Sequence, residues 1–126
     1  MDIQLTYHRR HTTTTQVGQL SIGSEQPVRI QTMANTSTND IDGSVAQAER
    51  CIAAGTELLR FTTQGIREVE SLAQIRKELC SMVKDSVVPL VADVHFQSDV
   101  ADAAAQVVEK VRINPGNYID PARKFK

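Results

Sequence analysis

Apolar residues recur along the chain in two rhythms, one typical of helices and one typical of strands. In three segments they lie mostly three or four residues apart and mark one helical face. The positions are Ile41, Val45, Ala48 and Ile52 in the first segment, Val69, Leu72, Ile75 and Leu79 in the second, and Val100, Ala101, Ala104 and Val107 in the third. The pattern therefore predicts three amphipathic helices, with Gly55 ending the first and Ser98 capping the third.

Short apolar runs around these helical segments predict four strands. The runs are PVRIQTM (27–33), ELLRF (57–61), VPLVADV (88–94) and KVRIN (110–114), and Pro115-Gly116 breaks the chain after the last run. Strands that alternate with helices form parallel sheets with right-handed crossovers. Because these strands are strongly apolar, we expect both faces of the sheet to be covered.

A small β-hairpin is predicted ahead of the first strand, because apolar and polar residues alternate around Gly18 within residues 16–23. The chain then divides into a polar segment with this hairpin, residues 1–26, and an α/β segment, residues 27–126. An open doubly wound sheet and a (β/α)₈ TIM barrel both fit the α/β segment. Since a complete barrel needs about 250 residues, four strand–helix units correspond to the first half of one.

Composition and charge exclude several classes of function. Of the 126 residues, 40% are hydrophobic and 23% are charged, as in ordinary globular proteins. A net charge of -1 gives no basic field for nucleic acid or an anionic membrane, and no apolar run is long enough for a membrane span. Cys51 and Cys80 lie within helical patterns and are expected to be reduced and buried. No apolar signal segment follows Arg9-Arg10, so we expect a cytoplasmic protein.

Polar side chains stand at the carboxyl ends of three predicted strands. Arg60 ends the second strand, Asp93 and His95 end the third, and Arg112 and Asn114 end the fourth. Since strand side chains alternate between faces, the last two pairs should each share one face. Ligands bind at the carboxyl ends of the strands in both candidate architectures. These five side chains are therefore predicted to meet in one site.

The two arginines in this predicted site favour a phosphorylated or otherwise anionic small molecule, because guanidinium N–H groups match phosphate oxygens in pairs. A purely structural Arg–Asp network is the alternative. A metal site is not favoured, since no third ligand stands beside Asp93 and His95, and no phosphate-loop or dinucleotide motif occurs. Charged residues of the second helix are expected on a solvated face: Arg67, Glu68, Glu70, Arg76, Lys77 and Glu78.

Four stretches, IQTMANTST, LLRFTTQG, VPLVADVHF and VRINPGNYIDPARKF, resemble the 4-hydroxy-3-methylbut-2-enyl diphosphate synthases in their order and spacing. These are iron–sulfur enzymes of the non-mevalonate isoprenoid pathway. VADVHF and RINPGN are specific as a pair, while TTQG and NYIDPARKF resemble the longer, three-domain form. The resemblance implies a TIM barrel followed by a domain with a four-iron four-sulfur cluster, held by three cysteines and a glutamate, in a head-to-tail homodimer.

The resemblance also implies a reaction, the reductive ring opening of 2-C-methyl-D-erythritol 2,4-cyclodiphosphate with electrons from ferredoxin or flavodoxin. By this likeness Arg60 and Arg112 hold the diphosphate, while Asp93, His95 and Asn114 line the barrel mouth. The cluster cysteines and the second half of the barrel have no counterpart here. We therefore expect an N-terminal fragment that is inactive alone and either pairs with another copy or is marginally stable. A pterin-binding barrel similar to dihydropteroate synthase and a non-catalytic α/β module are the alternatives.

Overall fold

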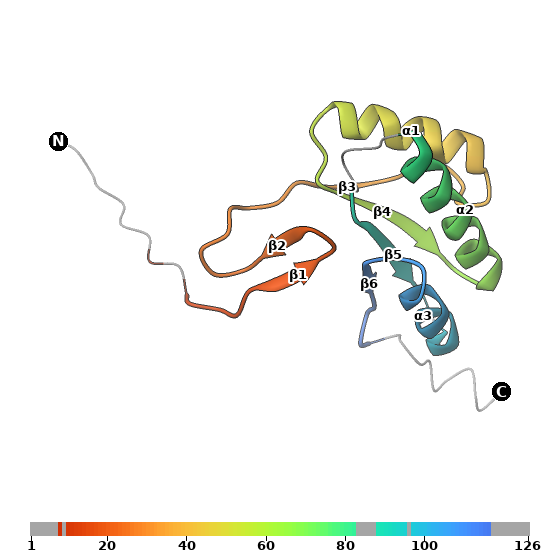
Figure 1. The fold of residues 1–126 in the computed structure, drawn as a ribbon. Coiled ribbons are helices and arrows are strands. Elements are labelled where there is room, and N and C mark those ends of the chain that lie inside the picture. Colours follow the sequence, from red (N-terminus) through yellow and green to blue (C-terminus); the bar gives the residue numbers. More distant parts are fainter. Residues whose placement is uncertain (1–7, 9, 83–87, 96, 117–126) are drawn as a thin grey trace.

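A computed structural model describes residues 8, 10–82, 88–95 and 97–116, which form a hairpin, a four-stranded sheet and three helices (Figure 1). The hairpin pairs β1 (Thr15–Val17) with β2 (Leu20–Ile22) in antiparallel fashion. The sheet contains β3 (Gln31–Met33), β4 (Leu58–Thr63), β5 (Leu90–Val94) and β6 (Lys110–Arg112), and the helices are α1 (Ile41–Ala53), α2 (Ile66–Met82) and α3 (Ser98–Ala105). Within these described ranges, no helix is long and apolar enough to cross a membrane.

The strands of the sheet lie in space in their chain order, β3-β4-β5-β6, and each neighbouring pair is parallel. A doubly wound sheet reverses its strand order at a switch point, and the described strands show no reversal. The three helices lie on one side of the sheet, and the hairpin lies on the other (Figure 1). This is the arrangement of a (β/α)₈ barrel segment, in which helices surround the sheet and the opposite face lines the interior.

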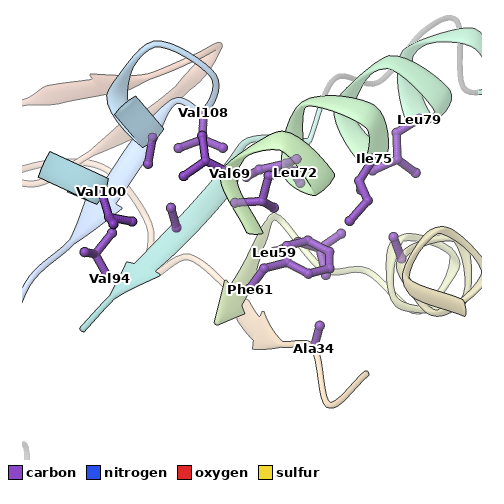
Figure 2. Packing of buried hydrophobic residues seen from close by; sticks show 14 of the residues in the cluster. Ala34, Leu59, Phe61, Val69, Leu72, Ile75, Leu79, Val94, Val100 and Val108 are labelled. Atoms are coloured by element: carbon purple, nitrogen blue, oxygen red, sulfur yellow. The ribbon is translucent and has the colours of Figure 1, made fainter. Parts of the chain in front are cut away.

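The main hydrophobic core lies between the sheet and the helices (Figure 2). Leu59 and Phe61 of β4 are completely buried in it. The predicted apolar face of α2 is buried against them, and these positions are Val69, Leu72, Ile75 and Leu79. Since burying apolar area is the main favourable term in folding, this packing explains why the helical periodicity was readable from the sequence.

The hairpin covers the amino ends of the strands on the inner face. Val17 of β1 is buried with Leu58 and Val91, the inward-facing residues near the starts of β4 and β5. Leu20 and Ile22 of β2 pack against the same cluster. The predicted hairpin is therefore confirmed, and it covers the inner face of the sheet at the amino ends of β4 and β5.

Arg29 ties this hairpin to the sheet. Its Nε donates to the carbonyl oxygen of Ser21 in β2 at 3.0 Å, and its Nη1 donates to Oε2 of Glu57 at 3.1 Å. Glu57 Oε1 also accepts from the backbone N–H of Ile30 at 3.1 Å. The hairpin is thus fixed to the two segments that lead into β3 and β4.

Several local predictions were wrong. The first strand is limited to Gln31–Met33. Val28 is 89% exposed, and Ile30, 56% exposed, contributes its carbonyl oxygen, which accepts from the backbone N–H groups of Glu57 and Leu58, but is not itself a paired strand residue. Ser98 is the first residue of α3, and Gln97 occupies the N-cap without a side-chain hydrogen bond. Cys80 is exposed rather than buried, because it lies on the solvent side of α2, while Cys51 is half-buried; both are free thiols.

The charged residues of α2 do not all lie on a solvated face as expected. Arg76 is half-buried, and its Nη2 donates to Oε2 of Glu109 while its Nη1 donates to the carbonyl oxygen of Val88 at 3.2 Å. The same Glu109 oxygen accepts from the backbone N–H of Leu90 at 3.0 Å. Arg76 therefore joins α2 to the start of β5, and Glu68 is also half-buried.

Gly55, predicted to stop the first helix, follows the C-cap residue Ala54 and has a φ of +106°. We expect Gly55→Ala to destabilise the protein by about 1 kcal/mol, because an L side chain is strained at this backbone angle. A Cβ there would meet no atom within 4 Å, so the cost is one of backbone conformation only. Urea unfolding measures it, and Gly55→Asn should cost less because asparagine tolerates positive φ better. Equal losses for both variants would contradict this explanation.

Candidate functional site

Polar side chains gather on the inner face toward the carboxyl ends of the strands. Arg60 and Thr62 face this side because side chains alternate and the intervening Phe61 is buried toward the helices. The register places Thr62 opposite Asp93, and Asp93 opposite Arg112. Three neighbouring strands therefore bring their polar residues to one place on the sheet.

Asp93 is the centre of this cluster and is only 1% exposed. Its Oδ2 accepts from Arg60 Nε at 3.1 Å and from Arg60 Nη2 at 2.6 Å. Its Oδ1 accepts from Arg112 Nη1 at 3.0 Å. His95 Nε2 lies 3.4 Å from Oδ2. The structure thus brings four of the five predicted site residues together around one carboxylate.

The charges of the cluster favour the ionised form of Asp93. Burial raises the pKa of its carboxyl group, but hydrogen bonds from Arg60 and Arg112, and the charges of Arg60 and His95, outweigh burial and hold the pKa below the ordinary 3.8. The arginine side chains remain 25% and 38% exposed. Arg60 Nη1 and Arg112 Nε and Nη2 are not used in the bonds to Asp93. Asp93 therefore fixes two guanidinium groups that still have N–H donors for another anion.

Asn114 is not part of the bonds around Asp93. The strand ends at Arg112, so the alternation that predicted a shared face does not extend to Asn114. Its Oδ1 instead accepts from the backbone N–H of Gly116 at 3.0 Å. A role for Asn114 in ligand binding stays a prediction. The motif residues Phe96 and 117–126 lie outside the described residues.

A polar pocket beside the cluster was missed from the sequence. It has a volume of about 140 Å³, lies between the segments that follow β3 and β4, and is lined by Thr36, Ser37, Thr38, Thr62, Gln64 and Glu68. We had expected Glu68 on a solvated face. The signal that could have identified it is a glutamate in the first turn of a helix, three residues after Gly65, where a side chain often folds back toward the preceding loop.

The part of the chain that the structure describes offers no ligand set for an iron–sulfur cluster. No three His, Cys, Asp or Glu side chains there come close enough together to hold a metal ion. Cys51 and Cys80 lie on different helices as free thiols. The cluster that the resemblance implies therefore does not fit these described residues.

The stability of the protein should fall in acid because of Asp93. Its pKa is lowered in the folded state, so its contribution to stability is complete above the ordinary pKa of 3.8 and is lost as the pH falls through the lower folded pKa. Urea unfolding at pH 7, 5, 4 and 3 measures this loss. Asp93→Asn should show a smaller decrease between pH 5 and pH 3 than the unmodified protein. If the free energies of unfolding of the two proteins fell in parallel as the pH is lowered, Asp93 would not be the cause of the acid sensitivity.

Parallel strands in chain order, helices on their outer side and a charged cluster at their carboxyl ends define a segment of a (β/α)₈ TIM barrel. Residues 12–126 match the family described as the GcpE TIM-barrel domain. The chain belongs to this family, which confirms the predicted fold class and the resemblance seen in the sequence motifs.

Three curated relatives of the chain share the name 4-hydroxy-3-methylbut-2-en-1-yl diphosphate synthase (flavodoxin). The protein from Bacteroides fragilis (strain ATCC 25285) is 53% identical over 120 residues, which are 95% of this chain and 19% of the relative. The one from Porphyromonas gingivalis is 48% identical over 90% of the chain, and that from Chlamydia muridarum is 43% identical over 93%. The chain spans about 19% of the length of each of these relatives.

Proposed function

We propose that this chain is the N-terminal part of a 4-hydroxy-3-methylbut-2-enyl diphosphate synthase. The complete enzyme would be an oxidoreductase that opens the ring of 2-C-methyl-D-erythritol 2,4-cyclodiphosphate in isoprenoid biosynthesis. The observation that supports this proposal most strongly is the Asp93 carboxylate, which orients Arg60 and Arg112 on the interior face of a GcpE-family barrel segment. Ligands of such barrels bind at this end of the strands.

In this proposal the diphosphate binds to the N–H groups that Arg60 and Arg112 do not use on Asp93. Two guanidinium groups and one carboxylate leave a net charge of +1 at the cluster before any charge on His95. Charge-assisted bonds between guanidinium and phosphate are stronger than bonds between neutral groups. His95 contacts the substrate near its ring or phosphate, and Asn114 supports the bound position. The contribution of these residues is binding, orientation and charge neutralisation.

The remaining parts of the enzyme are proposed from the length of the relatives, since the chain spans about 19% of them. Residues 1–26 supply the hairpin segment and residues 27–126 the first half of the barrel. The second half and a domain with a four-iron four-sulfur cluster lie in the rest of a longer polypeptide. Flavodoxin, which the names of the relatives contain, or ferredoxin supplies the electrons. The whole enzyme is a cytoplasmic homodimer, and residues 1–126 have no redox activity alone.

Ligand binding tests this proposal. Isothermal titration calorimetry of the complete polypeptide should show binding of the cyclic diphosphate, with inorganic diphosphate competing for the same site. A pterin should not compete, because the site is built around cationic donors for an anion. Binding of the pterin without binding of the cyclic diphosphate would overturn the proposal. If neither ligand binds, the hydrogen bonds between Asp93 and the two arginines would have a structural role only.

A further inference from the structure

We propose that the pocket beside Asp93 is a second subsite that recognises hydroxyl groups of the substrate's carbon skeleton, with Glu68 as a specificity-determining residue. This inference rests on the proposed function, which assigns the phosphate groups of the same ligand to Arg60 and Arg112. It concerns the uncharged, hydroxylated half of the molecule, which that proposal does not assign to Arg60 or Arg112.

The position of Thr62 connects the two subsites. Thr62 lines the pocket, stands opposite Asp93 in the sheet and follows Arg60 by two residues on the same strand face. Two residues along a strand correspond to about 7 Å, which is roughly the width of a small cyclic sugar-like diphosphate. A ligand whose phosphates contact Arg60 and Arg112 therefore extends its carbon skeleton toward the pocket.

The chemistry of the pocket lining selects against phosphate and for hydroxyl groups. All six lining residues are hydroxyl, amide or carboxylate side chains, and a cation is not among them. Glu68 would repel a phosphate, whereas a carboxylate oxygen accepts well from a neutral hydroxyl group. The cationic cluster and this pocket are thus complementary to the two different halves of one ligand.

Several polar groups of the pocket lining already form hydrogen bonds within the protein, and others do not. Thr38 Oγ1 donates to the carbonyl oxygen of Thr62 at 2.6 Å, and Thr36 Oγ1 is 2.9 Å from Ser44 Oγ. Glu68 Oε1 accepts from Asn39 Nδ2 at 3.2 Å. Within the described residues, the structure shows no hydrogen bond to Glu68 Oε2 or to the side-chain hydroxyl of Thr62. A ligand hydroxyl group would satisfy both.

Helix capping is the alternative role for Glu68. Its carboxylate lies against the loop at the start of α2, where a Cβ on Gly65 would be 3.2 Å from Oε2. Glutamine serves in this capping position as glutamate does, and its amide oxygen still accepts from Asn39. Glu68→Gln therefore separates the two roles, because it removes the charge that a ligand hydroxyl group would bind while it preserves the hydrogen bond from Asn39 and the ability to cap the helix.

The test uses steady-state kinetics of the complete enzyme with Glu68→Gln and Thr62→Val, the second of which removes a hydroxyl group at constant shape. Each is expected to raise KM for the cyclic diphosphate about tenfold with little change in kcat, the pattern for lost ground-state binding. The inhibition constant of inorganic diphosphate, which lacks the carbon skeleton, should stay unchanged. Glu70→Gln, on the same helix but outside this pocket, is the matched control.

An unchanged KM in both variants would overturn the inference, and so would equal rises in KM and in the inhibition constant, since the pocket would then act only through the arginines. The proposed function fails in a different way. If inorganic diphosphate does not inhibit the unmodified enzyme, the arginine cluster is not the phosphate site, whatever the two pocket variants do.

Discussion

In the complete enzyme that we propose, Arg60→Ala is expected to lower kcat/KM for the cyclic diphosphate by well over tenfold. Arg60 is the residue that contributes two hydrogen bonds to the buried Asp93 and still has Nη1 available for the substrate. A hydrogen bond to a charged group contributes about 1.5–3 kcal/mol, which corresponds to roughly tenfold to more than hundredfold in rate. The alanine variant also leaves Asp93 with fewer partners, so the orientation of Arg112 should suffer as well.

Two further variants define the cause of this loss. Arg60→Lys keeps the positive charge but lacks the planar fork that binds Asp93 and phosphate together, so it should recover only part of the activity. Arg50→Ala removes an exposed arginine from the last turn of α1 and should leave the kinetics unchanged. Normal kinetics in Arg60→Ala would reject the role of this residue in binding the diphosphate.

Asp93→Ala is expected to destabilise the protein by about 3 kcal/mol, the lower part of the range for breaking a buried ion pair. The carboxylate is almost completely buried and accepts from two arginines on neighbouring strands. Without it, two guanidinium groups stand side by side with no counter-charge. The partial exposure of Arg60 and Arg112 lets water reduce this penalty, which is why we expect the lower value.

Urea unfolding at pH 7 measures the effect of Asp93→Ala, and Asp102→Ala is the control. Asp102 is exposed on α3, so its removal should change the free energy of unfolding by less than about 0.5 kcal/mol. Asp93→Asn should lie between the two, because the amide oxygen accepts one bond without the charge. A loss below about 1 kcal/mol in Asp93→Ala would mean that the arginines find other partners and that Asp93 does not position them.

The helices and most strands were predictable because burial on one face dictates their periodicity. Leu72 and Ile75 are completely buried on the predicted face of α2. The extent of β3 was not predictable, since Val28 and Ile30 alternate like strand residues although the paired residues of β3 begin only at Gln31, and both side chains are exposed. The cap of α3 was misplaced by one residue because Gln97, which lacks a capping bond, leaves no local signal.

The charged part of the site was predictable because parallel strands end at the same edge. Arg60, Asp93 and Arg112 were assigned to a common site from their positions at strand ends, and they form hydrogen bonds in the structure. Alternation failed for Asn114, which comes after the strand has ended. The pocket at Glu68 depends on how the segments after β3 and β4 pack, and the one local signal for it is the position of Glu68 in the first turn of α2, three residues after Gly65.

The hairpin has a consequence for how a ligand could reach the arginines. Val17 packs on Leu58 and Val91 and so covers the inner face of the sheet on the amino-terminal side of Arg60 and Arg112. In the complete barrel that we propose, the hairpin would close the interior at the amino ends of the strands. A ligand of Arg60 and Arg112 would then enter and leave at the carboxyl ends of the strands, and a segment that covers this end would control both steps.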